Sequence, residues 1–102
     1  MVTVIFRAKM KAGKEDDAIA AMKKMAAAVE SAEGDTLVYA ICRNQEDPSE
    51  LLVLESYKDD AAFQAHMATS HMGDMRAAFG DLFEPSGVKL ERIERLAGFA
   101  RG

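Results

Sequence analysis

Apolar and polar residues alternate along residues 2–10, and this two-residue period predicts a strand. One face of the strand would be apolar throughout, made by Val2, Val4, Phe6, Ala8 and Met10. The opposite face is mostly polar, with Ile5 as its exception. The chain therefore opens with a strand that has one face suited to a hydrophobic core.

The period changes after Gly13, and residues 14–32 are predicted to form a helix. The apolar positions now recur at three- and four-residue steps, as in Ala18, Met22, Met25 and Val29. Acidic residues 15–17 fall in the first turn, where they complement the positive end of the helix dipole. Gly34 is expected to end the helix, because glycine readily adopts the left-handed conformation found there.

Residues 36–44 and 50–57 predict two more strands, joined through the turn-forming sequence Asp47-Pro48-Ser49. These strands differ from the first, because both of their faces are apolar. In the first of them, Leu37, Tyr39 and Ile41 alternate with Val38, Ala40 and Cys42. A hairpin with two apolar faces needs cover on both sides.

A broken helix is predicted to follow the hairpin. Asp59 is a natural N-cap for a short helix that reaches about Ala68, and Ser70 is expected to cap a second helix over residues 71–83. The apolar stripe of the second helix comprises Met72, Met75, Phe79, Leu82 and Phe83. The break places two short helices at an angle where one continuous helix would otherwise run.

The last predicted element is a strand over residues 88–96, after a stop at Pro85-Ser86-Gly87, while residues 97–102 show no clear pattern. The whole order is strand, helix, strand, strand, broken helix, strand. This is the split βαβ order of an α+β, ferredoxin-like fold, with helices on one face of a four-stranded antiparallel sheet. We expect one domain over residues 1–102.

Two helical segments can cover only one face of such a sheet. The other face of the hairpin would be left as an exposed apolar patch, which usually marks an interface. We therefore expect a homodimer packed sheet to sheet about a two-fold axis.

Charge and composition exclude several classes of partner. The net charge is −4 and no cluster of Lys and Arg is present, which argues against nucleic-acid binding. The N-terminal apolar run is too short for a membrane span and lacks a signal-peptide pattern. The single cysteine, Cys42, allows no internal disulfide and fits a cytoplasmic location.

Both histidines lie close together, five residues apart, at positions 66 and 71. Histidine exchanges protons near neutral pH, so the pair suggests a site. His66 shares a helix face with Phe63, at the margin where a pocket could open. His71 falls in the first turn of a helix, which disfavours a positive imidazolium, so we expect a neutral ring able to accept a proton. Ordinary packing of both rings is the alternative.

The residues around the histidines suit a pocket for flat organic molecules. Met67, Met72 and Met75 have flexible side chains, Tyr39 lies on a neighbouring strand, and Arg76 could bind an anionic oxygen. Core packing and solvent exposure are their alternative roles. A metal site is not predicted, because a five-residue spacing does not align two ligands on one helix and no additional carboxylate is evident.

The chain resembles the antibiotic biosynthesis monooxygenase (ABM) domains of the dimeric α/β-barrel superfamily over nearly its whole length. The resemblance rests on Gly13-Lys14-Glu15, Glu33-Gly34, Tyr39, Glu55-Ser56-Tyr57 and Asp59…Ala62-Phe63…His66…Ser70-His71. It implies a dimer with one pocket per subunit, between the sheet and the broken helix. Members include cofactor-free oxygenases of quinols and polyketide phenols, haem-degrading enzymes and a small-molecule isomerase.

The haem-degrading branch is not expected here. That branch uses an asparagine in the first strand, a tryptophan on the short helix and a histidine ligand on the next helix. Phe6, His66 and Arg76 align with those three positions, and the chain contains no tryptophan.

The sequence thus predicts a monooxygenase that needs no metal, haem or flavin and oxidises a small aromatic phenol or quinol with molecular oxygen. His66 and His71 are the candidate catalytic bases. The candidate substrate-binding residues are Phe6, Tyr39, Phe63, Met67, Met72, Met75 and Arg76. Two alternatives stay open, a non-catalytic dimeric domain that binds a small molecule in a stress response, and an isomerase of a small oxygenated metabolite.

Overall fold

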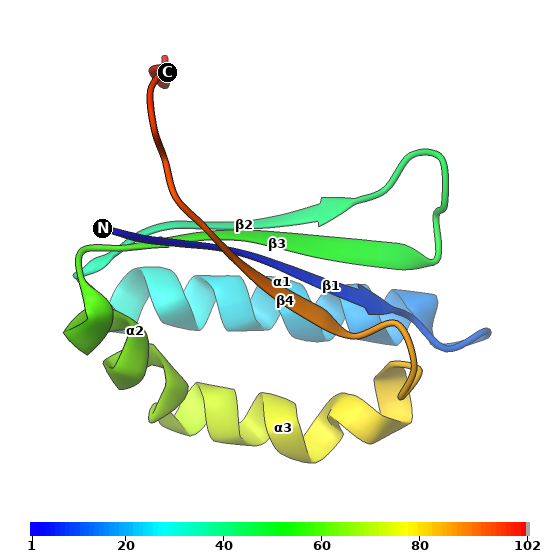
Figure 1. Cartoon of the computed structure of the whole chain (residues 1–102). Coiled ribbons are helices and arrows are strands. Elements are labelled where there is room, and N and C mark those ends of the chain that lie inside the picture. Colours follow the sequence, from blue (N-terminus) through cyan, green and yellow to red (C-terminus); the bar gives the residue numbers. More distant parts are fainter. Residues whose placement is uncertain (102) are drawn as a thin grey trace.

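The structure is a computed structural model that describes residues 1–101. Its seven elements, shown in Figure 1, are β1 (Val2–Lys9), α1 (Glu15–Ala32), β2 (Thr36–Arg43), β3 (Glu50–Tyr57), α2 (Asp60–Met67), α3 (Ser70–Leu82) and β4 (Lys89–Ile93). The predicted order of elements is therefore confirmed. So is the α+β class with one four-stranded antiparallel sheet.

The strand order in the sheet is β2-β3-β1-β4, which puts the first and third strands at its centre. Register places Phe6 opposite Val53 and Tyr39 opposite Glu55, so these four side chains share one face. Figure 1 shows all three helices on that same side of the sheet. The space between the helices and these strands is where a core and a cavity can form.

The alternation in β1 and the helical period in α1 predict the core correctly. Val4 and Ala8 of β1 are fully buried, as is Ala18 of α1. Ala8 and Ala18 belong to a cluster at one end of the sheet that also contains Met10, Met22, Leu51, Val53 and Phe83. A smaller cluster at the other end contains Val2, Val4, Tyr57, Ala62 and Phe63.

The boundary between α2 and α3 differs from the prediction. Asp59 caps α2 as expected, and its carboxylate accepts the Ala62 N–H at 2.8 Å. Thr69, however, caps α3, and Ser70 is the first helical residue, so the prediction of a Ser70 cap is wrong. The Thr69 hydroxyl accepts the Met72 N–H and donates to the His66 carbonyl at 2.7 Å. It thereby satisfies backbone groups at both helix ends, a double role that favours Thr69 over Ser70.

Two further elements, α3 and β4, end earlier than predicted. Helix α3 ends at Leu82, because Phe83 is already extended and forms a bridge with Met10. Strand β4 spans only Lys89–Ile93, since its pairing with β1 stops there.

The sheet face opposite the helices carries exposed apolar side chains from several strands. Val38 of β2, Leu54 of β3 and Ile93 of β4 are each more than two-fifths exposed. The chain after β4 runs toward that side in Figure 1, and it carries the exposed residues Leu96 and Phe99. None of the helices within residues 1–101 is long and apolar enough to cross a membrane.

Candidate functional site

A cavity of about 490 Å³ lies between the sheet and the broken helix. Its wall is almost wholly apolar, and its volume is typical of small-ligand sites. All seven residues predicted to bind substrate line this cavity, namely Phe6, Tyr39, Phe63, Met67, Met72, Met75 and Arg76. His66 also lines it, and His71 does not.

Five lining residues were not predicted from the sequence: Met22, Glu55, Phe79, Val88 and Leu90. Met22 and Phe79 had been placed in the helical stripes, where core packing was the expected role. Glu55 is the informative omission, because it is a carboxyl group in an apolar wall. The period of β3 could have found it, since Glu55 shares a face with the buried Leu51 and Val53.

His66 is buried on the inner face of α2, and its Nδ1 contacts the Glu33 carboxylate. The distances from Nδ1 to the two carboxylate oxygens are 2.9 and 3.0 Å. A carboxylate only accepts hydrogen bonds, so Nδ1 must carry the proton. No residue among 1–101 bonds to Nε2, and the His66 ring lines the cavity. The unprotonated ring nitrogen is therefore the one available to a ligand.

Aromatic rings fix the orientation of the His66 imidazole. The Tyr39 ring centre lies 5.5 Å from that of His66, and the Tyr57 ring centre lies 5.3 Å away. Burial lowers the pKa of His66, the Glu33 carboxylate opposes this shift, and the positive charges of His71 and Arg76 add to it. The net lowering favours a neutral ring at neutral pH.

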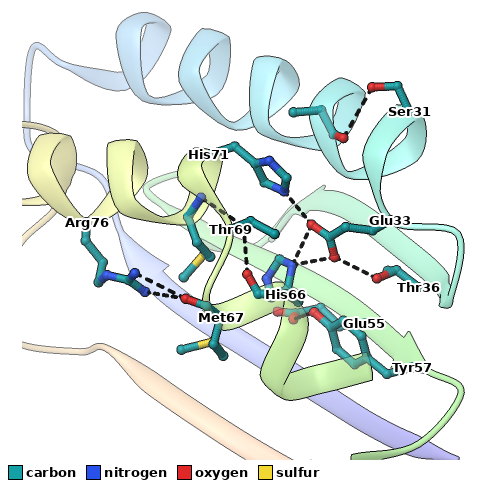
Figure 2. Close-up of polar contacts among 12 residues, drawn as sticks. Ser31, Glu33, Thr36, Glu55, Tyr57, His66, Met67, Thr69, His71 and Arg76 are labelled. Atoms are coloured by element: carbon teal, nitrogen blue, oxygen red, sulfur yellow. Dashed lines mark hydrogen bonds and ion pairs between the residues drawn. The ribbon is translucent and has the colours of Figure 1, made fainter. Parts of the chain in front are cut away.

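Glu33 connects three elements, as Figure 2 shows. It is the C-terminal cap residue of α1, and its carboxylate accepts hydrogen bonds from His66 of α2 and from Nε2 of His71 on α3. The Thr36 hydroxyl donates to the same carboxylate at 2.8 Å. Burial raises the pKa of Glu33, but these donors and the charge of His66 outweigh it and lower the pKa overall, so the carboxylate is ionised.

Glu33 also corrects an expectation from the sequence. The absence of a carboxylate was a reason for not predicting a metal site, yet Glu33 brings one to both histidines. The nitrogen and oxygen donor atoms of Glu33, His66 and His71 all lie within 4.8 Å of one another. Glu33 and His66 are more than thirty residues apart in the sequence, so their contact could not be predicted from local spacing. The sequence pattern indicated only that Glu33 lies at a helix end.

His71 lies in the first turn of α3, as the sequence predicts, but it does not line the main cavity. It lines a smaller hollow of about 200 Å³ between α1 and α3. His66 and His71 therefore do not line a common cavity. The physical reason is the turn at Thr69, which directs α3 away from α2 so that the two rings approach Glu33 from different sides.

Glu55 is the second carboxyl group of the site, and it is buried in the wall of the cavity. The Tyr57 hydroxyl donates to it at 2.5 Å. Burial raises the pKa of Glu55 to about 7, although the hydrogen bond from Tyr57 lowers it, and the charge of Glu33 adds to the increase. The cavity therefore contains a nitrogen that accepts a proton and a carboxyl group that can donate one near neutral pH.

Arg76 lies at the rim of the cavity. Both of its terminal nitrogens donate to the Met67 carbonyl at 3.1 Å, which ties α3 back to the end of α2 (Figure 2). The guanidinium thus holds the break between the helices closed and adds a positive charge beside an otherwise apolar wall.

The fold and this cavity define a small α+β domain with a partly open, largely apolar cavity of the size of a ligand site. The sequence profile of one family, described as antibiotic biosynthesis monooxygenase (ABM), matches residues 1–78. Because that match covers more than half of the chain, the protein belongs to the ABM family. The resemblance seen in the sequence is confirmed, and no curated protein matches the chain.

Several solved structures share the fold. A Bacteroides thetaiotaomicron protein provisionally named an antibiotic biosynthesis monooxygenase is 21% identical, with a TM-score of 0.87 over 99% of this chain and 94% of its own. PA3566 from Pseudomonas aeruginosa is 24% identical, with a TM-score of 0.85 over 94% of each chain. Rv0793 from Mycobacterium tuberculosis is 22% identical, with a TM-score of 0.86 over 97% of this chain and 98% of its own. At these identities, the comparison establishes the fold alone.

Proposed function

We propose that the protein is a monooxygenase that binds a small aromatic phenol or quinol in the main cavity and uses His66 as a general base. One observation carries this proposal, the imidazole whose Nδ1 is held by Glu33 while its ring lines an apolar cavity of about 490 Å³. A carboxylate that holds one ring nitrogen leaves the other as the proton acceptor, and a base positioned in this way contributes about 10²–10⁴ in rate.

The chemistry needs only the substrate and molecular oxygen. His66 removes a proton from the phenol, and the electron-rich anion transfers electrons to oxygen so that a carbon–oxygen bond forms. The imidazolium returns the proton to the distal peroxide oxygen. For a ring CH₂ group of the anthrone type, loss of water from the hydroperoxide then leaves a carbonyl. One oxygen atom enters the product, the other leaves as water, and no external reductant is consumed.

The walls of the cavity support this role for a flat, uncharged substrate. Methionine side chains adapt to ring-shaped ligands, and Phe6 and Phe63 offer aromatic faces. Arg76 at the rim is the group able to stabilise a phenolate or peroxide charge. The two short helices exclude water from the anion, which keeps the base and the substrate together.

The experiment is to measure oxygen uptake by metal-free protein with a panel of menadiol- and anthrone-type substrates. Turnover above buffer autoxidation is expected for at least one member and should fall by about 10²–10⁴ in His66→Gln, which keeps a donor for Glu33 but no base. Gln64→Ala is the matched control on the exposed face of α2. No turnover with any member of the panel, or equal turnover in His66→Gln, would refute the proposal.

A second candidate, isomerisation of a small oxygenated metabolite, is favoured by Glu55. A carboxyl group with a pKa of about 7 and a neutral imidazole line the same cavity, and a proton shift between two carbons needs one acceptor and one donor. Product formation without oxygen consumption would favour the isomerase. Binding of a small molecule without any turnover would favour the non-catalytic alternative.

We also infer that the protein acts as a homodimer packed through the open face of the sheet. The support is the apolar surface formed by Val38, Leu54 and Ile93, which a monomer would expose to water. Sedimentation analysis should give a dimer for the wild type and a monomer for Leu54→Asp, which places a charge in the centre of that face. A monomeric wild type at assay concentration would contradict the inference.

A further inference from the structure

We propose that Glu33, His66 and His71 form a binding site for a divalent transition metal of the Zn²⁺ class. Two imidazoles and one carboxylate are a donor set that suits Zn²⁺, whereas Mg²⁺ and Ca²⁺ prefer oxygen ligands. The three residues come from the end of α1, from α2 and from α3, so the fold itself brings them together.

The distances fit a common ion. Nδ1 of His66 lies 2.9 and 3.0 Å from the two Glu33 oxygens, and all the donor atoms lie within 4.8 Å of one another. Ligands on one Zn²⁺ ion, with bonds of about 2.0–2.2 Å, stand roughly 3–3.5 Å apart in tetrahedral or octahedral geometry. Small rotations of the His71 and Glu33 side chains would therefore place all three donors around an ion.

Burial and charge also favour a cation at this point. The side chains of Glu33 and His66 are 8% and 3% exposed, and that of His71 is 16% exposed. The cluster contains the carboxylate of Glu33, and a carboxylate attracts a cation. The Thr36 hydroxyl donates a hydrogen bond to the Glu33 carboxylate and so orients it, as donors outside the ligand set do in metal sites.

A surface hollow gives an ion access to the donor cluster. This hollow, of about 350 Å³, has Glu33, His66 and Thr69 among its lining residues. The exposed acidic residues Asp35 and Asp59 line the same hollow, so its electrostatic potential attracts cations. An open coordination position would face this hollow.

Metal binding would alter the proposed catalytic base, and this consequence rests on the proposed function. A neutral imidazole that binds a metal through Nδ1 keeps its proton on Nε2, the nitrogen proposed to accept the proton of the substrate. His66 would change from a proton acceptor into a donor. Zn²⁺ is therefore expected to inhibit oxygen uptake, so that metal availability would regulate the enzyme.

The test is calorimetric titration of tag-free protein with Zn²⁺, and with Mg²⁺ for comparison, in the absence of any substrate. We expect one Zn²⁺ per chain, no measurable Mg²⁺ binding and a higher melting temperature with Zn²⁺. Co²⁺ should give the visible absorption bands of nitrogen-ligated metal. His71→Ala and Glu33→Gln should each weaken Zn²⁺ binding at least 100-fold.

Asp74→Asn is the matched control, because Asp74 lines the hollow beside His71 but supplies no donor to the cluster. It should leave Zn²⁺ affinity unchanged. Absence of Zn²⁺ binding at millimolar concentration, or equal binding by wild type, His71→Ala and Glu33→Gln, would overturn the inference. Thr36→Val provides a check with all three ligands retained, and it should weaken binding by about 10–100-fold.

The two proposals fail separately. Zn²⁺ binding by the three residues without oxygen uptake on any substrate would refute the oxygenase and retain the metal site. Oxygen uptake that depends on His66, with no Zn²⁺ binding, would refute the metal site and retain the oxygenase.

Discussion

The two ends of the helix-covered face of the sheet differ in what they bury. One end is a dry cluster in which Leu51, Val53 and Phe83 are almost fully buried among other apolar residues. The other end buries Glu55 and His66 beside Tyr57, each hydrogen-bonded to another polar group. Burial of polar groups costs stability, so the second end is poorly explained by packing alone. The first end therefore contributes most to stability, and the second end is where we propose that the chemistry takes place.

The largest expected effect separates activity from stability at the polar end. His66→Gln should lower oxygen uptake by about 10²–10⁴, because the variant lacks a base in the cavity. Its melting temperature should stay close to that of the wild type, since the glutamine amide can still donate to Glu33. If His66→Gln lost activity only because part of the protein was unfolded, the polar end would have a structural role like that of the dry end.

Leu51→Ala tests the dry end. Truncating this buried leucine should lower the free energy of unfolding by about 2–5 kcal/mol, because it removes apolar contacts and leaves a cavity. Denaturant titration measures the loss. Activity per folded molecule should be retained, since Leu51 does not line the ligand cavity. A large loss of activity in the folded variant would contradict this.

Glu55→Gln tests whether the polar end destabilises the fold. A folded pKa of about 7, against 4.5 ordinarily, means that the native state binds a proton more tightly than the unfolded state. Wild-type stability therefore falls as the pH rises from about 4.5 through about 7. At about 1.4 kcal/mol for each pKa unit, the cost above pH 7 is about 3 kcal/mol.

The glutamine side chain of Glu55→Gln does not ionise, so the variant should not lose unfolding free energy as the pH rises. Denaturant titrations should show equal stability near pH 4 and a more stable variant at pH 8. Glu46→Gln, in the exposed turn between β2 and β3, is the control and should follow the wild type. If the unfolding free energies of Glu55→Gln and wild type changed with pH in parallel, burial would not raise the pKa of Glu55.

The smallest expected effect comes from Tyr57→Phe. The change removes the hydroxyl that donates to Glu55 and should cost about 1 kcal/mol in unfolding free energy. Because that hydrogen bond lowers the pKa of Glu55, its loss should move the titration of Glu55 to higher pH. Chemical shifts of the Glu55 carboxyl carbon against pH measure this directly, and an unchanged midpoint would contradict the assigned contact.

The sequence predicted the dry end and much of the cavity wall because both follow local periods. Alternation in β1 and the helical stripe of α1 place Val4, Ala8 and Met22 on the core face. Phe6, Tyr39 and Phe63 were likewise predicted to bind a ligand, and they line the cavity. The open apolar face was also foreseen from the two-sided hairpin strands.

The polar contacts could not be predicted in the same way. Glu33 meets His66 across thirty-three positions, and no local period encodes such a contact. His71 meets the same carboxylate across thirty-eight positions, so this contact could not be predicted from a local period either. Glu55 is different, because the alternation in β3 already places it on the inner face.

The central claim is that Glu33 fixes His66 with its proton on Nδ1 and leaves Nε2 free for a ligand. The most direct measurement is the nitrogen NMR spectrum of the His66 ring in metal-free protein at neutral pH, before and after addition of a menadiol-type phenol. We predict a protonated Nδ1 and an unprotonated Nε2 whose resonance shifts when the phenol binds. A proton on Nε2, or an Nε2 resonance that does not respond to any bound phenol, would contradict the account.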